Sequence, residues 1–113
     1  MSIDVRGRDG VIIVTLSGRI IGPAGGELRQ TLNQQLENID APKVLFDLGE
    51  VTRIDSSGLG TLVATQVTVA RKGGRAAIIN VGESIQNLLV MGRLITVFEG
   101  YDSEEEAIVG LTS

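Results

Sequence analysis

The chain has 113 residues, 42% of them hydrophobic but only 3% aromatic, with a net charge of −4 and neither cysteine nor histidine. This length fits one domain, residues 1–113, whose core is built from Val, Ile, Leu and Ala. The 10 basic residues are scattered, whereas nucleic acids and anionic membranes bind clustered Lys and Arg, so the composition indicates a protein partner instead.

The first predicted elements are two strands joined by a tight turn. Ile3 to Arg8 and Val11 to Ser17 flank Asp9-Gly10, a dipeptide typical of β-hairpins. Gly18 and the glycine-rich stretch Gly22 to Gly26 end this pattern. The hairpin therefore predicts an antiparallel pair at the start of the sheet.

A helix, a strand and a second helix are predicted next. Pro23 suits the opening of the first helix, whose buried face is formed by Leu28, Leu32, Leu36 and Ile39. Lys43 to Leu48 is short and apolar enough to be an interior strand. From Ser57 onward apolar residues recur at helical spacing, up to the cations and glycines of Arg71 to Gly74 that favour a helix C-terminus.

The remaining predicted elements are shorter. We expect strands over Arg75 to Val81 and Ile95 to Glu99, and between them a helix over Glu83 to Met91 with Ile85, Leu88 and Leu89 inward. Asp102-Ser103 can cap a closing helix that buries Ala107, Ile108 and Leu111. Strands that alternate with helices predict an α/β fold with a largely parallel sheet.

Several kinds of site and segment are not expected. Glu104 to Glu106 point around a helix and cannot converge on one metal ion, so they predict a solvated first turn. Met1 to Arg6 lacks the pattern of a signal peptide, and the longest apolar run, Val11 to Val14, is far too short to span a membrane. We therefore expect a cytoplasmic protein with no bound metal or cofactor.

Asp55 and Ser56 fall where the second helix begins, at its N-cap or first turn. One interpretation is a capping cluster, but capping uses one hydroxyl and leaves the second of Ser56 and Ser57 spare. The other interpretation is a phosphorylation site, because a phosphoryl group there meets free N–H donors and the positive end of the helix. Such a serine would switch binding rather than act as a nucleophile.

The stretch Ile54 to Gly60, preceded by Phe46-Asp47-Leu48 and Val51, resembles the signature of STAS domains, particularly the bacterial anti-sigma factor antagonists. The tail from Val97 to Ala107 is similar to the C-terminal stretch of that family. The resemblance covers the whole chain. It implies a single STAS domain with a mixed, mostly parallel β-sheet and helices packed mainly on one face.

The resemblance also implies a function. Ser56 matches the serine that is phosphorylated by a kinase that is also the anti-sigma factor; the unphosphorylated form binds this kinase and frees a sigma factor, and a PP2C-type phosphatase resets the switch. The expected partner-binding residues are Asp55, Ser57, Gly58, Leu59, Arg19, Ile21, Gly22 and Met91. Met91 would add an exposed apolar contact near a turn glycine.

One departure from the family pattern leaves an alternative open. Family members usually carry Gly-Glu-Leu-Asp where this chain has Gly18-Arg19-Ile20-Ile21, so both acids are missing. This favours either a partner of reversed charge or a constitutive STAS scaffold, in a signalling assembly or as an accessory subunit of a transporter. An enzyme is not expected, because no histidine is available as a base and Gly-x-Ser-x-Gly is absent.

Overall fold

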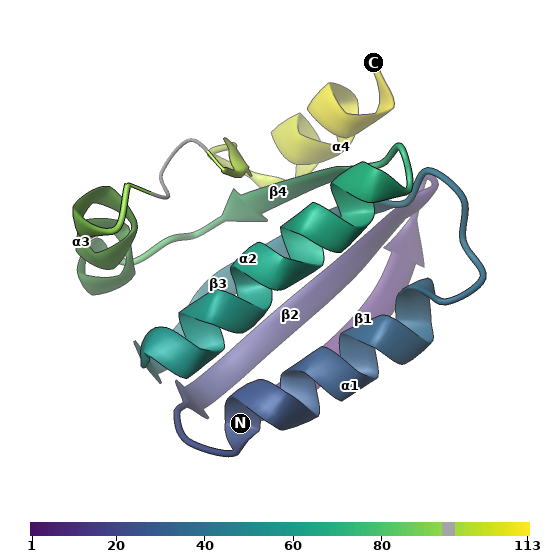
Figure 1. The fold of residues 1–113 in the computed structure, drawn as a ribbon. Helices are drawn as coiled ribbons and strands as arrows, with labels where there is room; N and C mark the ends of the chain where they lie inside the picture. Colours follow the sequence, from purple (N-terminus) through teal and green to yellow (C-terminus); the bar gives the residue numbers. More distant parts are fainter. Residues whose placement is uncertain (94–96) are drawn as a thin grey trace.

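A mixed β-sheet forms the centre of the computed structural model, which describes residues 1–93 and 97–113 (Figure 1). In this described part of the chain the five strands lie side by side in chain order: β1 (Ser2–Arg8), β2 (Val11–Ile20), β3 (Lys43–Ile54), β4 (Arg75–Ile79) and β5 (Glu99–Gly100). β1 is antiparallel to β2, and every other neighbouring pair is parallel. The predicted layout is therefore confirmed.

Helices cover both faces of this sheet unequally. They are α1 (Ala24–Leu36), α2 (Ser56–Arg71), α3 (Glu83–Met91) and α4 (Glu104–Thr112). Because side chains alternate along a strand, Val14 and Phe46 join the larger core with α1, α2 and α3, whereas Ile13 and Leu45 join a smaller core under α4. Helices packed mainly on one face are thus confirmed. Within the described ranges no helix combines the length and hydropathy needed to cross a membrane.

The N-terminal hairpin forms as predicted. Asp9 and Gly10 both have positive φ angles, 52° and 81°, as a two-residue turn with the twist of a hairpin requires. Arg8 is the register partner of Val11, directly across the turn. The Asp-Gly dipeptide therefore fixes the register of the whole first pair.

Two strands run further than the sequence predicted. β2 continues past Ser17 to Ile20, and β3 continues past Leu48 to Ile54. Gly18, which was interpreted as a break, lies at an irregularity within the pairing of β2 with β3 and takes the left-handed conformation, with φ 80°. Ile20 and Ile54 are buried and pair with one another. The extensions carry these strands up to the start of α2.

Other predicted boundaries differ as well. The strand expected to reach Val81 ends at Ile79, because Asn80 turns to a positive φ of 56° and its amide donates to Asp47 (3.0 Å). Leu88, expected inward on α3, is 39% exposed, while Ile85 and Leu89 are buried as predicted. Burial on α3 is limited because only one narrow stripe of this short helix meets the sheet layer.

The last strand and the first helix are also shifted. The strand expected from Ile95 to Glu99 is observed at Glu99–Gly100, and residues 95 and 96 of that prediction lie outside the described residues. α1 begins directly after Pro23, as predicted, but ends at Leu36, so Ile39 lies in the following loop, where it is half-buried, and is not part of the buried helix face.

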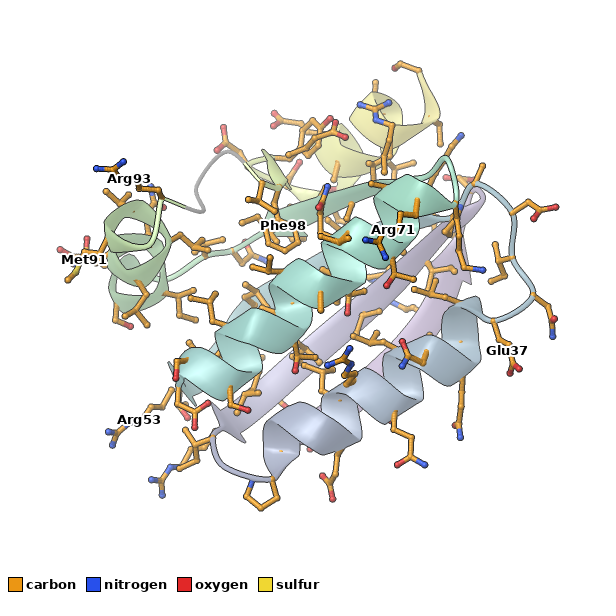
Figure 2. The ribbon with its side chains drawn as sticks, viewed as in Figure 1. Glu37, Arg53, Arg71, Met91, Arg93 and Phe98 are labelled. Atoms are coloured by element: carbon orange, nitrogen blue, oxygen red, sulfur yellow. The ribbon has the colours of Figure 1, made fainter. Side chains whose placement is uncertain are left out.

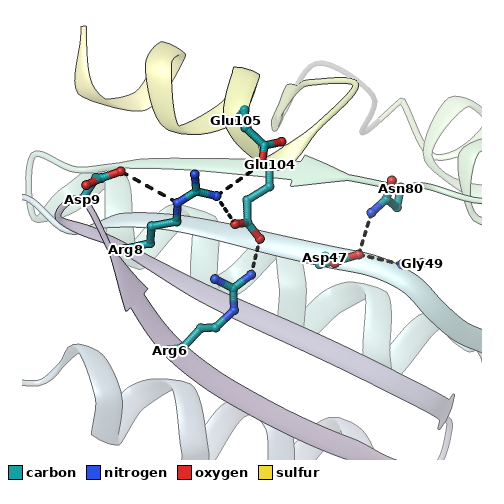
Figure 3. A network of polar contacts seen from close by, with 8 residues as sticks. All are labelled: Arg6, Arg8, Asp9, Asp47, Gly49, Asn80, Glu104 and Glu105. Atoms are coloured by element: carbon teal, nitrogen blue, oxygen red, sulfur yellow. Dashed lines mark hydrogen bonds and ion pairs between the residues drawn. The ribbon is translucent and has the colours of Figure 1, made fainter.

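Glu104 corrects the expectation of a wholly solvated first turn on α4. Its carboxylate accepts hydrogen bonds from Arg6 and Arg8 of β1, and its side chain is only 19% exposed (Figure 3). Arg6 and, secondarily, Arg8 hold the pKa of Glu104 below its usual value. These contacts fasten the closing helix to the edge strand, a pairing that no local pattern could reveal.

Glu104→Gln should destabilise the protein at neutral pH, and the loss should vanish in acid. Because the pKa of Glu104 is lower in the folded state, its contribution is present above the unfolded pKa and disappears as the pH falls through the folded one. Urea unfolding of both proteins from pH 7 to below about 4 measures this. Glu105→Gln is the matched control, since Glu105 is 71% exposed with a single long contact to Arg8. If the difference in stability between Glu104→Gln and the wild type did not change with pH, the stabilising role given to the Glu104 carboxylate would be wrong.

Candidate functional site

Asp55 organises the junction between β3 and α2. It lies in extended conformation directly before the helix, and its Oδ1 accepts from the backbone N–H of Gly58 (2.9 Å). Its Oδ2 accepts from the N–H of Gly22 (2.8 Å), in the loop between β2 and α1. The predicted N-cap is confirmed, and the same carboxylate ties two loops together. Both bonds, that of Gly58 most, lower the pKa of Asp55.

Gly58 is buried where α2 meets the two extended strands. A Cβ atom there would lie 2.7 Å from the carbonyl oxygen of Ile20 and 2.8 Å from the side chain of Ile54. The same Ile20 carbonyl accepts from the Asp55 N–H (3.2 Å). Gly58 therefore permits a close helix–strand contact, and its part in partner binding stays a prediction.

Ser57 faces α1. A Cβ atom on the buried Gly25 would lie 2.8 Å from its Oγ, so the starts of α1 and α2 touch at this point. The Thr61 hydroxyl donates to the Gly25 carbonyl (3.0 Å) and lies 3.2 Å from the Ser57 carbonyl. Sequence reasoning missed Gly25 and Thr61, although Gly25 lies in the glycine-rich stretch and Thr61 one helical turn beyond Ser57.

Ser56 is the first residue of α2 and is exposed. In the part of the chain that the structure describes, neither its hydroxyl nor that of Ser57, which is also exposed, makes a hydrogen bond to another protein group, whereas both carboxylate oxygens of Asp55 accept one. The opening turn of α2 thus offers two exposed hydroxyls, and they differ in that the Ser57 Oγ lies beside Gly25 of α1.

Arginines and small apolar groups surround this turn. Arg19 and Arg53 are register partners at the ends of β2 and β3, and both are exposed. Ile21 and Leu59 are half-buried, and Gly22 is exposed with φ 56°. Sequence reasoning missed Arg53, because β3 was expected to end before it. Had the strand been extended, pairing with β2 would have placed it beside Arg19.

Met91 is apart from this group. It lies at the end of α3 and is 81% exposed, and Figure 2 shows it projecting away from the body of the domain. Leu88 and Val90 of the same helix are also exposed. The exposed apolar contact expected for Met91 is therefore present in geometry, but on another helix from the one that carries Ser56.

The groups around Ser56 offer little for acid–base chemistry. The chain contains no histidine. Both oxygens of the nearest carboxylate, Asp55, accept from backbone N–H groups, and its lowered pKa makes it a weak base. Among residues 1–93 and 97–113 no group of three potential ligands could hold a metal ion.

Asp55→Ala should lower the urea midpoint of unfolding, because the N–H groups of Gly58 and Gly22 lose their acceptors. The urea midpoint of Asp55→Asn should lie between those of Asp55→Ala and the wild type, because the single carbonyl oxygen of asparagine can still accept from the Gly58 N–H. Equilibrium unfolding of the three proteins at neutral pH tests this order. An alanine variant as stable as the wild type would show that the carboxylate does not hold the junction.

Comparisons with known proteins agree with the fold. Residues 2–107 match the sequence model of the STAS domain. An anti-sigma F factor antagonist of Paenibacillus polymyxa is 27% identical over 111 residues, covering 98% of this chain and 95% of that protein. An anti-sigma factor antagonist from Mycobacterium paratuberculosis has a similar structure, with a TM-score of 0.86 at 23% identity, covering 99% and 94% of the two chains. The Bacillus cell fate determinant SpoIIAA in its phosphorylated form gives a TM-score of 0.74 at 16% identity, covering 96% and 98%.

Proposed function

The chain belongs to the STAS domain family, and from this premise we propose that it is an anti-sigma factor antagonist whose binding is switched by phosphorylation of Ser56. Unphosphorylated, it binds an anti-sigma factor that is also a serine kinase and thereby frees a sigma factor. Phosphorylation by that kinase ends the binding, and a PP2C-type phosphatase restores it. The chain acts as a binding module in the cytoplasm, without a cofactor and without catalysis of its own.

The exposure of Ser56 is the observation that carries this proposal. Its hydroxyl lies at the surface of the first turn of α2, with no protein partner in the described residues. Asp55 and Gly58 hold the turn beneath it through a 2.9 Å hydrogen bond. A kinase can therefore reach the serine without disturbing the contacts that fix the helix.

A phosphoryl group at this position would alter binding more than stability. It adds about −1.5 to −2 charges, which the positive end of a helix tolerates. Toward a partner, the same charge must be desolvated and matched, which an interface formed with a neutral hydroxyl cannot do. Unmodified and modified proteins would thus share one fold and differ in what they bind.

The comparisons support the proposal from two sides. The relative from Paenibacillus polymyxa is named an anti-sigma F factor antagonist and is covered over nearly its whole length. The Bacillus protein that shares this fold has a phosphorylated form. A minimal domain of this kind can therefore carry such a modification and keep its structure.

Phosphoryl transfer tests the proposal directly. Each anti-sigma factor of the source organism is purified and incubated with radiolabelled ATP and this protein. We expect one of them to label the wild type and Ser57→Ala but not Ser56→Ala. Label on Ser56→Ala, or no label with any of these kinases, would overturn the phosphorylation switch.

A constitutive STAS scaffold, in a signalling assembly or as an accessory subunit of a transporter, is the second candidate. It is favoured by Arg19 and Ile21, which stand where family members usually carry acids. The labelling experiment separates the two candidates, because no anti-sigma factor would label a constitutive scaffold at Ser56. A binding measurement separates them as well, since the Ser56→Asp variant of a scaffold would bind its partner as tightly as the wild type does.

A further inference from the structure

Building on the proposed function, we propose that Arg19 and Arg53 form a cationic docking pair that binds a carboxylate-rich surface of the partner protein, and that a phosphoryl group on Ser56 competes for this pair. The inference specifies the chemistry of the partner. It also specifies how phosphorylation blocks docking in this chain.

The two arginines lie side by side. They are register partners on adjacent parallel strands, which run about 4.8 Å apart. Both are exposed, and within residues 1–93 and 97–113 neither forms an ion pair with an acidic side chain. Figure 2 shows Arg53 extending away from the ribbon at the edge where β2 and β3 end. Two guanidinium groups are thus presented to solvent at one edge.

This placement has no evident structural purpose. Arg6, Arg8 and Arg75 are also exposed, but each is paired with a carboxylate that joins two elements. Arg29 and Arg71 are exposed without an ion pair in the described residues, but they lie on separate helices, whereas Arg19 and Arg53 are register partners on adjacent strands. Like charges on paired residues repel one another and cost stability. In a chain of net charge −4, an unneutralised cationic pair at a loop-bearing edge therefore points to a binding role.

Acidic groups nearby do not neutralise the pair. Asp55 uses both carboxylate oxygens for the N–H groups of Gly22 and Gly58. Glu50, three residues before Arg53 on β3 and opposite Ser17, is exposed and makes no ion pair in the described part of the chain. The two guanidinium groups therefore remain available to an incoming carboxylate.

The chemistry of guanidinium groups selects the partner. Their planar donors bind carboxylates and phosphates in a bidentate manner, so a surface rich in Asp and Glu is the complementary protein surface. Ser56 follows Arg53 by three residues, at most about 10 Å of extended chain. A phosphoryl group on Ser56 would therefore occupy the same donors and repel the acidic partner.

The first test uses the protein and a defined probe. A short polyglutamate peptide is titrated into the 15N-labelled protein at low ionic strength. We expect amide shifts to concentrate at residues 19–22 and 53–57, and to be lost in the Arg19→Gln/Arg53→Gln variant and in protein carrying phosphoserine at position 56. The control variant Arg29→Gln/Arg71→Gln removes two exposed arginines of α1 and α2, and we expect it to show the same amide shifts as the wild type. Shifts elsewhere, or none, would overturn the docking pair.

The second test uses the anti-sigma factor that labels Ser56. We expect Arg19→Gln/Arg53→Gln to weaken its binding by about ten-fold and to reduce its salt dependence, with the control variant unchanged. The melting temperature of the double variant should be equal or higher, which excludes loss through unfolding. If Arg19→Gln/Arg53→Gln bound the anti-sigma factor as tightly as the wild type does, the proposal of a docking pair would be wrong, but the proposed function would not be affected. Peptide binding at the pair, with no anti-sigma factor bound by the wild type, would overturn the proposed function alone.

Discussion

Gly58→Ala should lower the free energy of unfolding by about 2–3 kcal/mol, the cost of forcing a methyl group into a packed contact. The new Cβ would lie 2.7 Å from the Ile20 carbonyl oxygen and 2.8 Å from the side chains of Ile20 and Ile54. Neither the strand backbone nor the buried isoleucines can move away without opening the junction that Asp55 closes. Urea unfolding with linear extrapolation measures the loss.

Gly60→Ala is the matched control for this substitution. Gly60 is two residues further along α2, and a Cβ atom there would have no heavy atom within 4 Å. Because alanine favours a helix over glycine, this variant should gain about 0.5–1 kcal/mol. If both variants lost the same stability, close packing at Gly58 could not be the cause, and the account of the helix–strand contact would be wrong.

Ser56→Asp should weaken binding of the anti-sigma factor about 100-fold, or about 2.7 kcal/mol, while leaving the free energy of unfolding within about 0.5 kcal/mol. If Ser56 lies in the interface, as proposed, the carboxylate would place a desolvated and repulsive charge there. In the isolated protein it lies in solvent at the first turn of α2, where the helix dipole favours it. Isothermal titration calorimetry and urea unfolding give the two quantities.

Ser84→Asp provides the control for charge alone. Ser84 is exposed in the first turn of α3, so the same charge is added to the same part of another helix. We expect its binding to match that of the wild type. Equal weakening by both substitutions would mean that net charge, rather than charge at Ser56, governs docking.

The fold was largely predictable because local signals agree with one another. The Asp9-Gly10 turn and the apolar spacing along α1 and α2 each predicted the element that forms. The strand extensions were not predictable, because Gly18 looks like a stop and the apolar run of β3 ends at Leu48, and only pairing between β2 and β3 carries the backbone further, through irregularities. Sequence reasoning can locate a glycine but not the neighbouring strand that accommodates it.

The features of the candidate site that depend on neighbouring residues were predictable from the sequence. The contacts between distant segments were not. The cap formed by Asp55 follows from three residues of sequence, and so does the position of Ser56 on the first turn. The packing of Gly58 against Ile20 and the pairing of Arg19 with Arg53 join segments more than 30 residues apart. No pattern within either segment contains that information.

The most direct measurement compares two preparations of the protein, one with serine and one with phosphoserine at position 56, in calorimetric titration with the anti-sigma factor that labels this serine. Thermal unfolding of the same samples is recorded alongside. The account predicts that only the serine form binds and that both forms unfold at closely similar temperatures. Equal binding by the two forms, or a phosphorylated form that binds weakly because it has unfolded, would contradict it.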